Sequence, residues 1–357
     1  MRSLLWASLA TGLAGLGAVV GALGTPDPAR ARPALLCEAY PGTPDRADPH
    51  RGMVWIEGGV SQMGSDRFYS EERPAHQVSI AGFWMDRHPV TNAQFAAFVA
   101  ATGHVTRAER GLDASVMPDL PASARVPGSL VFTPPQGDGR PGRWRFVAGA
   151  NWRHPEGPGS SVAGRESHPV VHVNQEDALA YARWAGRELP TEAQFERAAR
   201  GGLMDEDYAW GSQMVPDGRH MANTWQGPFP FANRALDGFE GTSPVGCFPA
   251  NGYDLFDMGG NVWELTATWY RPHHDVRSGP DAGGPASSFD PRQPEIPAKV
   301  IKGGSHLCSP DLCWRFRPSA RQPQEVYLAT SHVGFRTVSG GPAGPGARRS
   351  MSGPGAW

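Results

Sequence analysis

The most informative stretch of this chain is Lys302-Gly-Gly-Ser-His-Leu-Cys308-Ser-Pro-Asp-Leu-Cys313-Trp-Arg-Phe-Arg-Pro-Ser-Ala-Arg321. It places two thiols five residues apart, among several Lys and Arg side chains. Nearby positive charge lowers the pKa of a thiol, and the thiolate is both the nucleophile and the metal ligand. A pair of thiolates is a soft donor set that favours Cu(I), Zn²⁺ or an iron–sulfur cluster. With only two protein ligands, a metal keeps a position open for substrate, as catalysis requires.

The same spacing also permits a plain disulfide between Cys308 and Cys313, so the residues alone leave both interpretations open. The chain has two other cysteines, Cys37 and Cys247. They either pair with each other or stay free, and the sequence does not decide between these outcomes.

The composition predicts a loop-rich globular fold. Glycine and proline contribute 45 and 35 of the 357 residues, which is high but below the range of disordered chains. The 12 Trp and 15 Phe residues indicate a packed interior. A formal net charge of −2 gives no reason to expect nucleic acid or an anionic membrane surface as a partner.

The N-terminus resembles a signal peptide, because Arg2 precedes a weakly apolar run over residues 4–23. Residues 1–24 are therefore predicted to direct export to the periplasm or the exterior. An uncleaved membrane anchor formed by the same run is the alternative. Residues 25–50 are rich in Pro, Ala, Arg and Asp, which is typical of a linker.

The folded part is expected to be one domain over residues 51–339. Within it, residues 111–145 and 275–297 are predicted to be surface insertions. The tail over residues 340–357 is rich in Gly, Pro and Ser and is expected to be disordered.

Local patterns predict two strands and three helices in the first part of this domain. One strand begins at Met53, and the alternating run His76–Met85 predicts a second. Each predicted helix begins after a polar capping residue and ends near a glycine. These helices run from Thr91 to Gly103, from Asn174 to Gly186 and from Thr191 to Gly201.

Several motifs in this order resemble the formylglycine-generating enzymes, also called sulfatase-modifying factors. Besides the cysteine stretch they include Met63-Gly64-Ser65, Ala150-Asn-Trp-Arg-His-Pro-Glu-Gly-Pro158, Gly260-Asn-Val-Trp-Glu264 and His332-Val-Gly-Phe-Arg336. Each motif is weak alone, but together they are specific, and the resemblance covers about residues 53–338. It implies a single α+β domain with little regular secondary structure, the sulfatase-modifying factor fold related to C-type lectin-like domains.

For the chemistry, the resemblance implies an oxygen-dependent oxidoreductase. Cys308 and Cys313 would hold Cu(I), with O₂ as the co-substrate. The reaction would convert a cysteine in a sulfatase motif Cys-x-Pro-x-Arg into Cα-formylglycine. This chemistry suits copper, whereas Zn²⁺ has no redox chemistry.

The resemblance also implies roles for four further residues. Ser305 would hydrogen-bond a thiolate or an oxygen species, Trp263 would exclude water, and Arg315 would stabilise negative charge. His332 stands where relatives usually carry Asn and would contact substrate. For Trp263, Arg315 and His332, the alternative is a structural residue whose polar groups are already satisfied.

Two structural Ca²⁺ sites are implied as well. Ca²⁺ prefers six to eight oxygen ligands from carboxylates, amides and backbone carbonyls. One set would be Asn223, Thr224, Asp237 and Phe239, and the other Asp257, Gly260, Val262 and Glu264. From spacing alone, the alternative is solvated loop acids and turn caps.

The partner implied by the resemblance is an unfolded sulfatase polypeptide bound to a monomer. Two rival hypotheses are a non-haem iron sulfoxide synthase and a non-catalytic, lectin-like binding module on the same fold. The first needs a preceding helical domain with histidine ligands, and only about 50 residues precede the fold here. Members of the second kind usually lack the cysteine pair.

Overall fold

The computed structural model describes residue 37 and residues 48–111, 125–135, 140–276 and 284–340. The predicted signal segment, most of the predicted linker and the tail beyond residue 340 lie outside the described residues.

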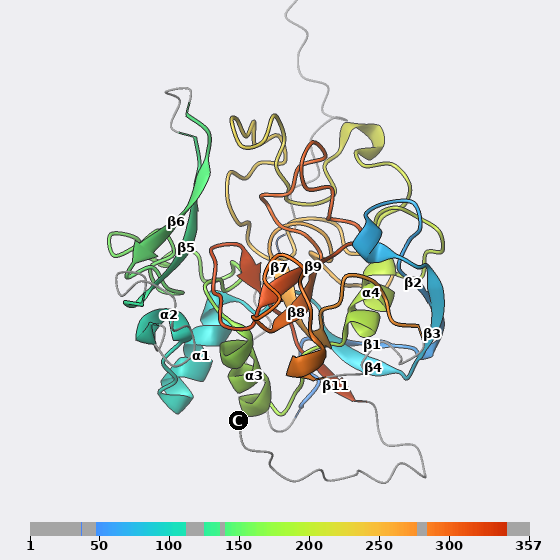
Figure 1. Ribbon diagram of the computed structural model, residues 1–357, viewed down its shortest axis with the longest axis horizontal. Coiled ribbons are helices and arrows are strands. Elements are labelled where there is room, and N and C mark those ends of the chain that lie inside the picture. The colour runs from blue at the N-terminus through green and yellow to red at the C-terminus, as the bar shows by residue number, and fades with distance from the viewer. Residues whose placement is uncertain (1–36, 38–47, 112–124, 136–139, 277–283, 341–357) are drawn as a thin grey trace, which may run out of the picture. The chain divides into compact units, whose positions relative to one another are not determined.

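The described part of the chain has the predicted loop-rich α+β character, with short strands and helices separated by long irregular segments (Figure 1). The strands are β1 Met53–Ile56, β2 Gly59–Met63, β3 His76–Ile80, β4 Phe83–Asp86, β5 Gly128–Thr133, β6 Arg143–Ala148, β7 Trp263–Trp269, β8 Ala298–Lys302, β9 Arg321–Glu325, β10 Val333–Gly334 and β11 Val338–Gly340. The α-helices are α1 Asn92–Thr102, α2 Arg107–Arg110, α3 Gln175–Trp184 and α4 Glu192–Arg200; short 3₁₀ turns are η2 Ser70–Glu72, η4 Pro216–Gly218 and η5 Pro285–Ser287.

The sheet that positions the cysteine stretch has the strand order β10-β7-β8-β9. Strand β8 ends at Lys302, and its antiparallel neighbour β9 begins at Arg321. Residues 303–320 therefore form the connection between two paired strands, so both ends of this loop are fixed. A second sheet, β1-β4-β11, and the pairs β2-β3 and β5-β6 complete the described sheets.

The three helices predicted from capping signals are confirmed. Thr91, Asn174 and Thr191 each accept a hydrogen bond from the backbone of the third helical residue, whose side chain bonds back to the cap. These reciprocal bonds satisfy N–H groups that a helix otherwise leaves open. Within the described ranges, no helix combines the length and apolar character needed to cross a bilayer.

The predicted strand over residues 76–85 is wrong in one respect, because it is two strands that pair with different partners. Strand β3 pairs with β2, and β4 pairs with β1. The two strands are separated by Ala81 and Gly82, and a side chain at Gly82 would come within 2.4 Å of the Trp55 ring. Strand β2 was not predicted, since Gly59–Met63 carries little strand propensity.

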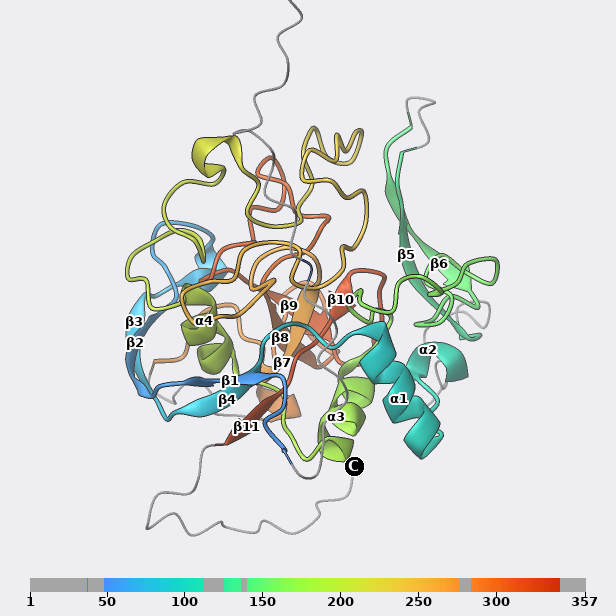
Figure 2. The ribbon, with the colours of Figure 1, turned by 180° about the vertical axis from the view of Figure 1, so that it is seen from behind.

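The predicted surface insertion over residues 111–145 contains regular structure. Strands β5 and β6 form an antiparallel hairpin that stands apart from the neighbouring loops in both views (Figures 1 and 2). Its base is held to the domain, because the Ser129 hydroxyl donates to the Ala329 carbonyl at 2.7 Å and the Ser331 N–H donates to the Leu130 carbonyl at 2.9 Å.

The largest hydrophobic core lies between helices α1 and α3 and the β7-containing sheet. Phe95, Tyr181 and Phe335 pack there as mutually contacting rings. Trp263 and Cys308 belong to the same cluster, and each is 1 % exposed. One of the two candidate thiols is thus part of the core.

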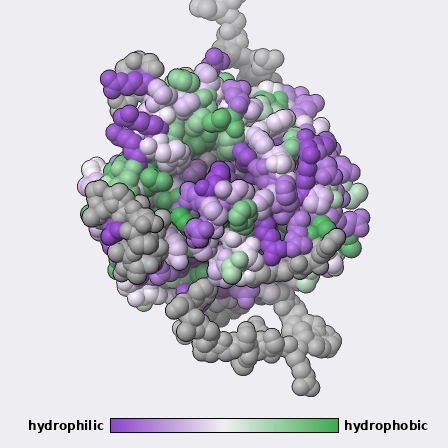
Figure 3. All heavy atoms as spheres, viewed as in Figure 1, coloured by the Kyte–Doolittle hydropathy of each residue, from purple (hydrophilic) through white to green (hydrophobic). Residues whose placement is uncertain are grey.

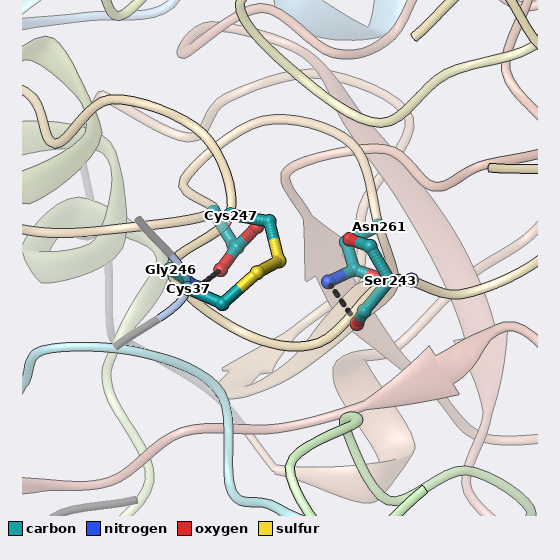
Figure 4. The surroundings of a disulfide bond; sticks show 6 residues. Cys37, Ser243, Gly246, Cys247 and Asn261 are labelled. Carbon is teal, nitrogen blue, oxygen red and sulfur yellow. Dashed lines mark hydrogen bonds between the residues drawn. A yellow bond between two sulfur atoms is a disulfide. The ribbon is translucent and has the colours of Figure 1, made fainter. Parts of the chain in front are cut away.

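The open question about the other two cysteines is settled, because Cys37 and Cys247 form a disulfide (Figure 4). Beside it, the Asn261 side chain and the Ser243 backbone exchange two hydrogen bonds of 3.1 and 3.2 Å. The bond ties a residue that precedes β1 to a loop 210 positions later. A cross-link over so long a loop restricts the unfolded chain strongly.

We expect Cys37→Ser to lower the free energy of unfolding by about 2–4 kcal/mol, because the unfolded chain regains the entropy of that long loop. Urea denaturation of the oxidised protein measures this loss. Cys37→Ser/Cys247→Ser is the matched control and should be no less stable than the single variant. Equal stability of the wild type and Cys37→Ser would contradict the prediction.

Candidate active site

Cys308 and Cys313 are free thiols whose sulfur atoms lie 2.6 Å apart. Cys308 is buried and Cys313 is half-buried. Burial and the neighbouring Cys313 raise the pKa of Cys308 well above its usual value. The hydrogen bond from Cys308, reinforced by Arg315, lowers the pKa of Cys313. Cys313 is therefore the thiol that ionises first, with Cys308 as its proton-carrying neighbour.

Arg315 supplies the positive charge beside this thiol. Its Nη2 donates to Glu71 Oε1 at 2.6 Å, and its guanidinium lies 3.8 Å from the centre of the Tyr69 ring. The Tyr69 hydroxyl in turn accepts a hydrogen bond of 3.1 Å from the Trp314 backbone N–H. Together with the hydrogen bond from Cys308, the guanidinium held in this way lowers the pKa of the Cys313 thiol.

The rest of the cysteine loop is held by buried ion pairs. Arg317 donates to both carboxylate oxygens of Glu72 at 2.5 and 2.9 Å, and both side chains are fully buried. Arg321 pairs in the same way with Glu192 at 2.7 and 3.0 Å. Lys302, at the other end of the loop, lies 3.7 Å from the same Glu192 carboxylate.

The sequence analysis did not identify Glu71, Glu72 or Glu192 as site residues. Each lies more than 100 positions from its cationic partner. The local sequence around each glutamate does not predict such long-range ion pairs.

Ser305 and Trp263 both lie in the buried surroundings of the cysteine loop. Ser305 is fully buried in the cysteine loop, and its carbonyl accepts a hydrogen bond of 2.8 Å from the Cys308 N–H. Its hydroxyl accepts a bond of 3.2 Å from the Leu307 N–H. Trp263 begins β7 and packs in the same core cluster as Cys308.

His332 lies beside the hairpin, and its carbonyl accepts a hydrogen bond of 2.9 Å from the Trp263 N–H. Its Nδ1 is 2.8 Å from the Thr330 hydroxyl, and its ring lies 4.6 Å from that of Trp144. Desolvation lowers the pKa of His332 to about 3, so the ring is neutral. Trp144 and Phe146 remain partly exposed, and Figure 3 shows hydrophobic residues gathered beside this hairpin.

The donor set of the cysteine pair fits a soft metal ion. Within the described ranges no three His, Cys, Asp or Glu side chains converge, so a metal here would have two thiolate ligands. Two sulfurs bound to one metal ion at about 2.3 Å each lie farther apart than the observed 2.6 Å, unless the S–metal–S angle is very acute. The pair has to open before a metal can enter between the sulfurs.

The first predicted Ca²⁺ site contains a buried oxygen that needs a partner. The Asn223 amide donates to the Gly241 carbonyl at 2.9 Å, but its Oδ1 has no hydrogen-bond partner among the described residues. The Asp237 carboxylate accepts from the N–H groups of Thr224 and Phe239 at 2.9 and 3.0 Å. Burial raises the pKa of Asp237, and a bound cation would offset that cost. These residues fit a hard cation.

The second predicted Ca²⁺ site has more negative than positive charge. Asp257 and Glu264 are both buried, and Glu264 accepts two hydrogen bonds of 2.7 Å from Arg336. Burial raises the pKa of Asp257 to about 6 and raises that of Glu264 too, against the opposing effect of Arg336. Asp257 has a left-handed φ of 55° and Gly260 a φ of 77°, as in a tight turn. The surplus carboxylate fits a cation, although Glu264 is already engaged.

Both candidate Ca²⁺ loops are hydrogen-bonded to the cysteine loop. The Trp225 N–H donates to the Cys308 carbonyl, and the Gly260 N–H donates to the Gly303 carbonyl, each at 2.9 Å. A side chain at Gly260 would meet the Asn223 carbonyl at 2.2 Å, so the two loops approach as closely as only glycine permits. Both candidate Ca²⁺ loops are therefore in direct backbone contact with the cysteine loop.

Comparisons with known proteins show which family the chain resembles. A family model described as the sulfatase-modifying factor enzyme 1-like domain matches residues 40–340. The formylglycine-generating enzyme of Mycobacterium tuberculosis is 53 % identical over 292 residues, which cover 80 % of this chain and 97 % of that protein. The formylglycine-generating enzyme of Mus musculus is 43 % identical over 293 residues, covering 80 % and 74 % respectively. Among solved structures, PvdO from Pseudomonas aeruginosa matches with a TM-score of 0.56 at 25 % identity, covering 85 % of this chain and all of that one.

Proposed function

The chain belongs to the formylglycine-generating enzyme (sulfatase-modifying factor) family, and from this premise we propose that Cys308 and Cys313 form its catalytic centre. The protein is an oxidoreductase that converts a sulfatase cysteine into formylglycine. The observation that supports this assignment of residues is the pair of free, adjacent thiols on a loop fixed at both ends. A non-catalytic module has no evident need for such a pair.

The cofactor in this proposal is Cu(I), held by the two cysteines. When bound, copper supplies the one-electron chemistry that O₂ needs in order to react. Cys313 enters as the more acidic thiol, and Arg315 compensates the negative charge that gathers there. Trp263 and the surrounding core exclude water from the buried side.

The substrate in this proposal is an unfolded sulfatase segment with the motif Cys-x-Pro-x-Arg. Oxidation of its CH₂–SH carbon to an aldehyde, with release of sulfide, yields two electrons, whereas reduction of O₂ to water takes four. The remaining two electrons must come from a reductant such as a thiol. An assay therefore has to contain O₂ and a reductant together.

A turnover assay tests this proposal. The purified protein, loaded with Cu(I), is incubated with a Cys-x-Pro-x-Arg peptide, a thiol reductant and air, and the peptide mass is followed. Conversion of the thiol to an aldehyde supports the function. The absence of conversion by a folded protein with copper bound would contradict it and favour the binding-module hypothesis.

The same proposal includes Ca²⁺ at both loops, with structural roles. Removal of Ca²⁺ by EGTA should lower the melting temperature by about 5–10 °C, since saturation at about 100 times Kd stabilises by about 2.7 kcal/mol and each kcal/mol shifts a domain of this size by about 2–4 °C. Calorimetry measures the shift, which readded Ca²⁺ should reverse.

Asn223→Ala should abolish much of this response, because it removes the unpartnered Oδ1. Asn251→Ala is the matched control, since that amide bonds the carbonyls of Ala198 and Ala199 instead. An EGTA shift as large in Asn223→Ala as in Asn251→Ala would contradict a calcium ligand at Asn223.

Export is also part of the proposal. Disulfides persist in oxidising compartments and are rare in reducing ones, so the Cys37–Cys247 bond supports a location outside the cytosol. The signal-like residues 4–23 lie outside the described residues. A monomeric state stays a prediction.

A further inference from the structure

The short segment Tyr69–Glu72 contacts two arginines of the cysteine loop. The Glu71 carboxylate accepts a hydrogen bond of 2.6 Å from Arg315. The neighbouring Glu72 carboxylate accepts two hydrogen bonds from Arg317. The segment contains the 3₁₀ turn η2, and 244 positions separate Glu71 from Arg315 along the chain. The fold therefore brings a distant acidic segment to the charged side chains that follow Cys313 in sequence.

This segment holds Arg315 by two contacts. Glu71 accepts from its Nη2, and the centre of the Tyr69 ring lies 3.8 Å from the guanidinium carbon. Tyr69 is itself fixed, because its hydroxyl accepts a hydrogen bond of 3.1 Å from the Trp314 N–H. The side chains of Arg315 and Glu71 are only 20 % and 17 % exposed, so solvent screens this ion pair less than a surface pair. Without these contacts, a long arginine side chain would have many rotamers open to it.

Other parts of the domain fix the backbone of the segment. The Glu71 carbonyl accepts a hydrogen bond of 3.1 Å from Arg321, at the start of β9. The Arg73 carbonyl, one residue beyond the segment, accepts a bond of 2.9 Å from the His274 N–H. The position of the Glu71 side chain is therefore supported by contacts that do not involve Arg315.

The position of the Arg315 charge matters at the thiol pair. The guanidinium interacts electrostatically with both Cys308 and Cys313. Cysteines bind a metal ion as thiolates, so two of them on a monovalent ion leave one negative charge uncompensated. A nearby cation stabilises that charge, and the interaction weakens as the distance grows. A guanidinium free to turn towards solvent would lose much of this effect.

We propose that Glu71 and Tyr69 are positioning residues, which hold the guanidinium of Arg315 beside the thiol pair and thereby strengthen the binding of Cu(I). The proposal rests on the function proposed above and adds two residues to the site. Both act through Arg315. Because Glu71 is itself negative, its charge alone would oppose the binding of an anionic copper–thiolate centre, so its positioning role and its bare charge have effects of opposite sign.

The Cu(I) affinity of the reduced protein distinguishes positioning from bare charge. It is measured without oxygen, by competition with the chelator bicinchoninate. Glu71→Ala should weaken binding by about 10-fold, the scale of one charge-assisted hydrogen bond. Glu71→Gln keeps an acceptor oxygen for Arg315 and should bind Cu(I) more tightly than Glu71→Ala. Unchanged or tighter binding by Glu71→Ala, relative to the wild type, would overturn the proposal.

A double-mutant cycle tests whether the two residues act through Arg315. Arg315→Gln should weaken Cu(I) binding, and Glu71→Ala should cause no further loss in that background. Tyr69→Leu removes the ring beneath the guanidinium and should weaken binding by about 2- to 5-fold, but only where Arg315 is present. Additional losses in the double variants would overturn the assignment, because the residues would then act by another route.

Glu176→Ala is the matched control. Glu176 also pairs with arginines, Arg107 and Arg110, but on helix α2 instead of the cysteine loop. Its removal should leave the Cu(I) affinity unchanged, and a loss equal to that of Glu71→Ala would overturn the proposal.

The outcomes separate the positioning role from the function. A wild type that binds Cu(I) with the expected dependence on Glu71 but converts no peptide would contradict the proposed function while the positioning role stands. A wild type that converts peptide but shows no dependence of Cu(I) affinity on Glu71 would leave the function and overturn the positioning role. A wild type that binds no Cu(I) would overturn the positioning role as well.

Discussion

Cys313→Ser is expected to abolish formylglycine formation, with a loss of at least about 1,000-fold in turnover, a scale typical of the removal of an essential reacting group. Serine keeps the size of the side chain but neither ionises near neutral pH nor binds a soft metal. Because Cys313 is only half-buried, the free energy of unfolding should change by less than about 1 kcal/mol. Mass spectrometry of the peptide measures turnover, and urea denaturation measures stability.

Cys247→Ser is the matched control for this experiment. It makes the same chemical change at a buried cysteine outside the catalytic pair. It should lose stability through the broken disulfide yet keep turnover at temperatures where it is folded. Substantial turnover by Cys313→Ser would mean that the thiol is not essential, and the assignment of the pair as the catalytic centre would fail.

The sequence predicted those parts of the fold that depend on local signals. The helices after Thr91, Asn174 and Thr191 were found correctly, because each capping box involves residues only three positions apart. The division between β3 and β4 shows the opposite case, since it depends on each strand pairing with a different partner.

The candidate site was predictable only where chemistry is concentrated in one segment. Cys308, Cys313 and Arg315 lie within eight residues, so their proximity could be anticipated. Glu72, which pairs with Arg317, lies 245 positions away and carries no distinguishing local pattern. The same holds for the disulfide of Cys37, whose partner lies 210 positions away.

Glu192→Gln is expected to lower the free energy of unfolding by about 3–5 kcal/mol, the cost of breaking a buried ion pair on one side. Glu192 is 1 % exposed. Its carboxylate accepts hydrogen bonds from Arg321, which begins β9, and lies 3.7 Å from Lys302, which ends β8. A neutral amide leaves Arg321 without its charged partner, while Lys302 keeps its closer contact with Glu196 at 3.0 Å. Because both ends of the cysteine loop meet at this carboxylate, turnover should fall as well.

The pH dependence gives this prediction a second, independent readout. Burial alone would raise the pKa of Glu192, but Arg321, His274 and Lys302 together hold it below its usual value. The stabilisation is therefore complete above the unfolded-state pKa of about 4.3 and is lost as pH falls through the lower folded-state value. The wild type should lose more stability on acidification than Glu192→Gln, which lacks the titrating group.

Glu176→Gln is the control that shows how much of the loss in stability comes from the burial of the ion pair. Glu176 also pairs with two arginines, Arg107 and Arg110, but its side chain is 44 % exposed. Solvent screens such pairs, so this variant should lose less than about 1 kcal/mol. If urea denaturation gave similarly small losses for both variants, the shared carboxylate would not hold the loop. A large loss confined to Glu192→Gln would instead show that the catalytic loop depends on a charge contributed by helix α4.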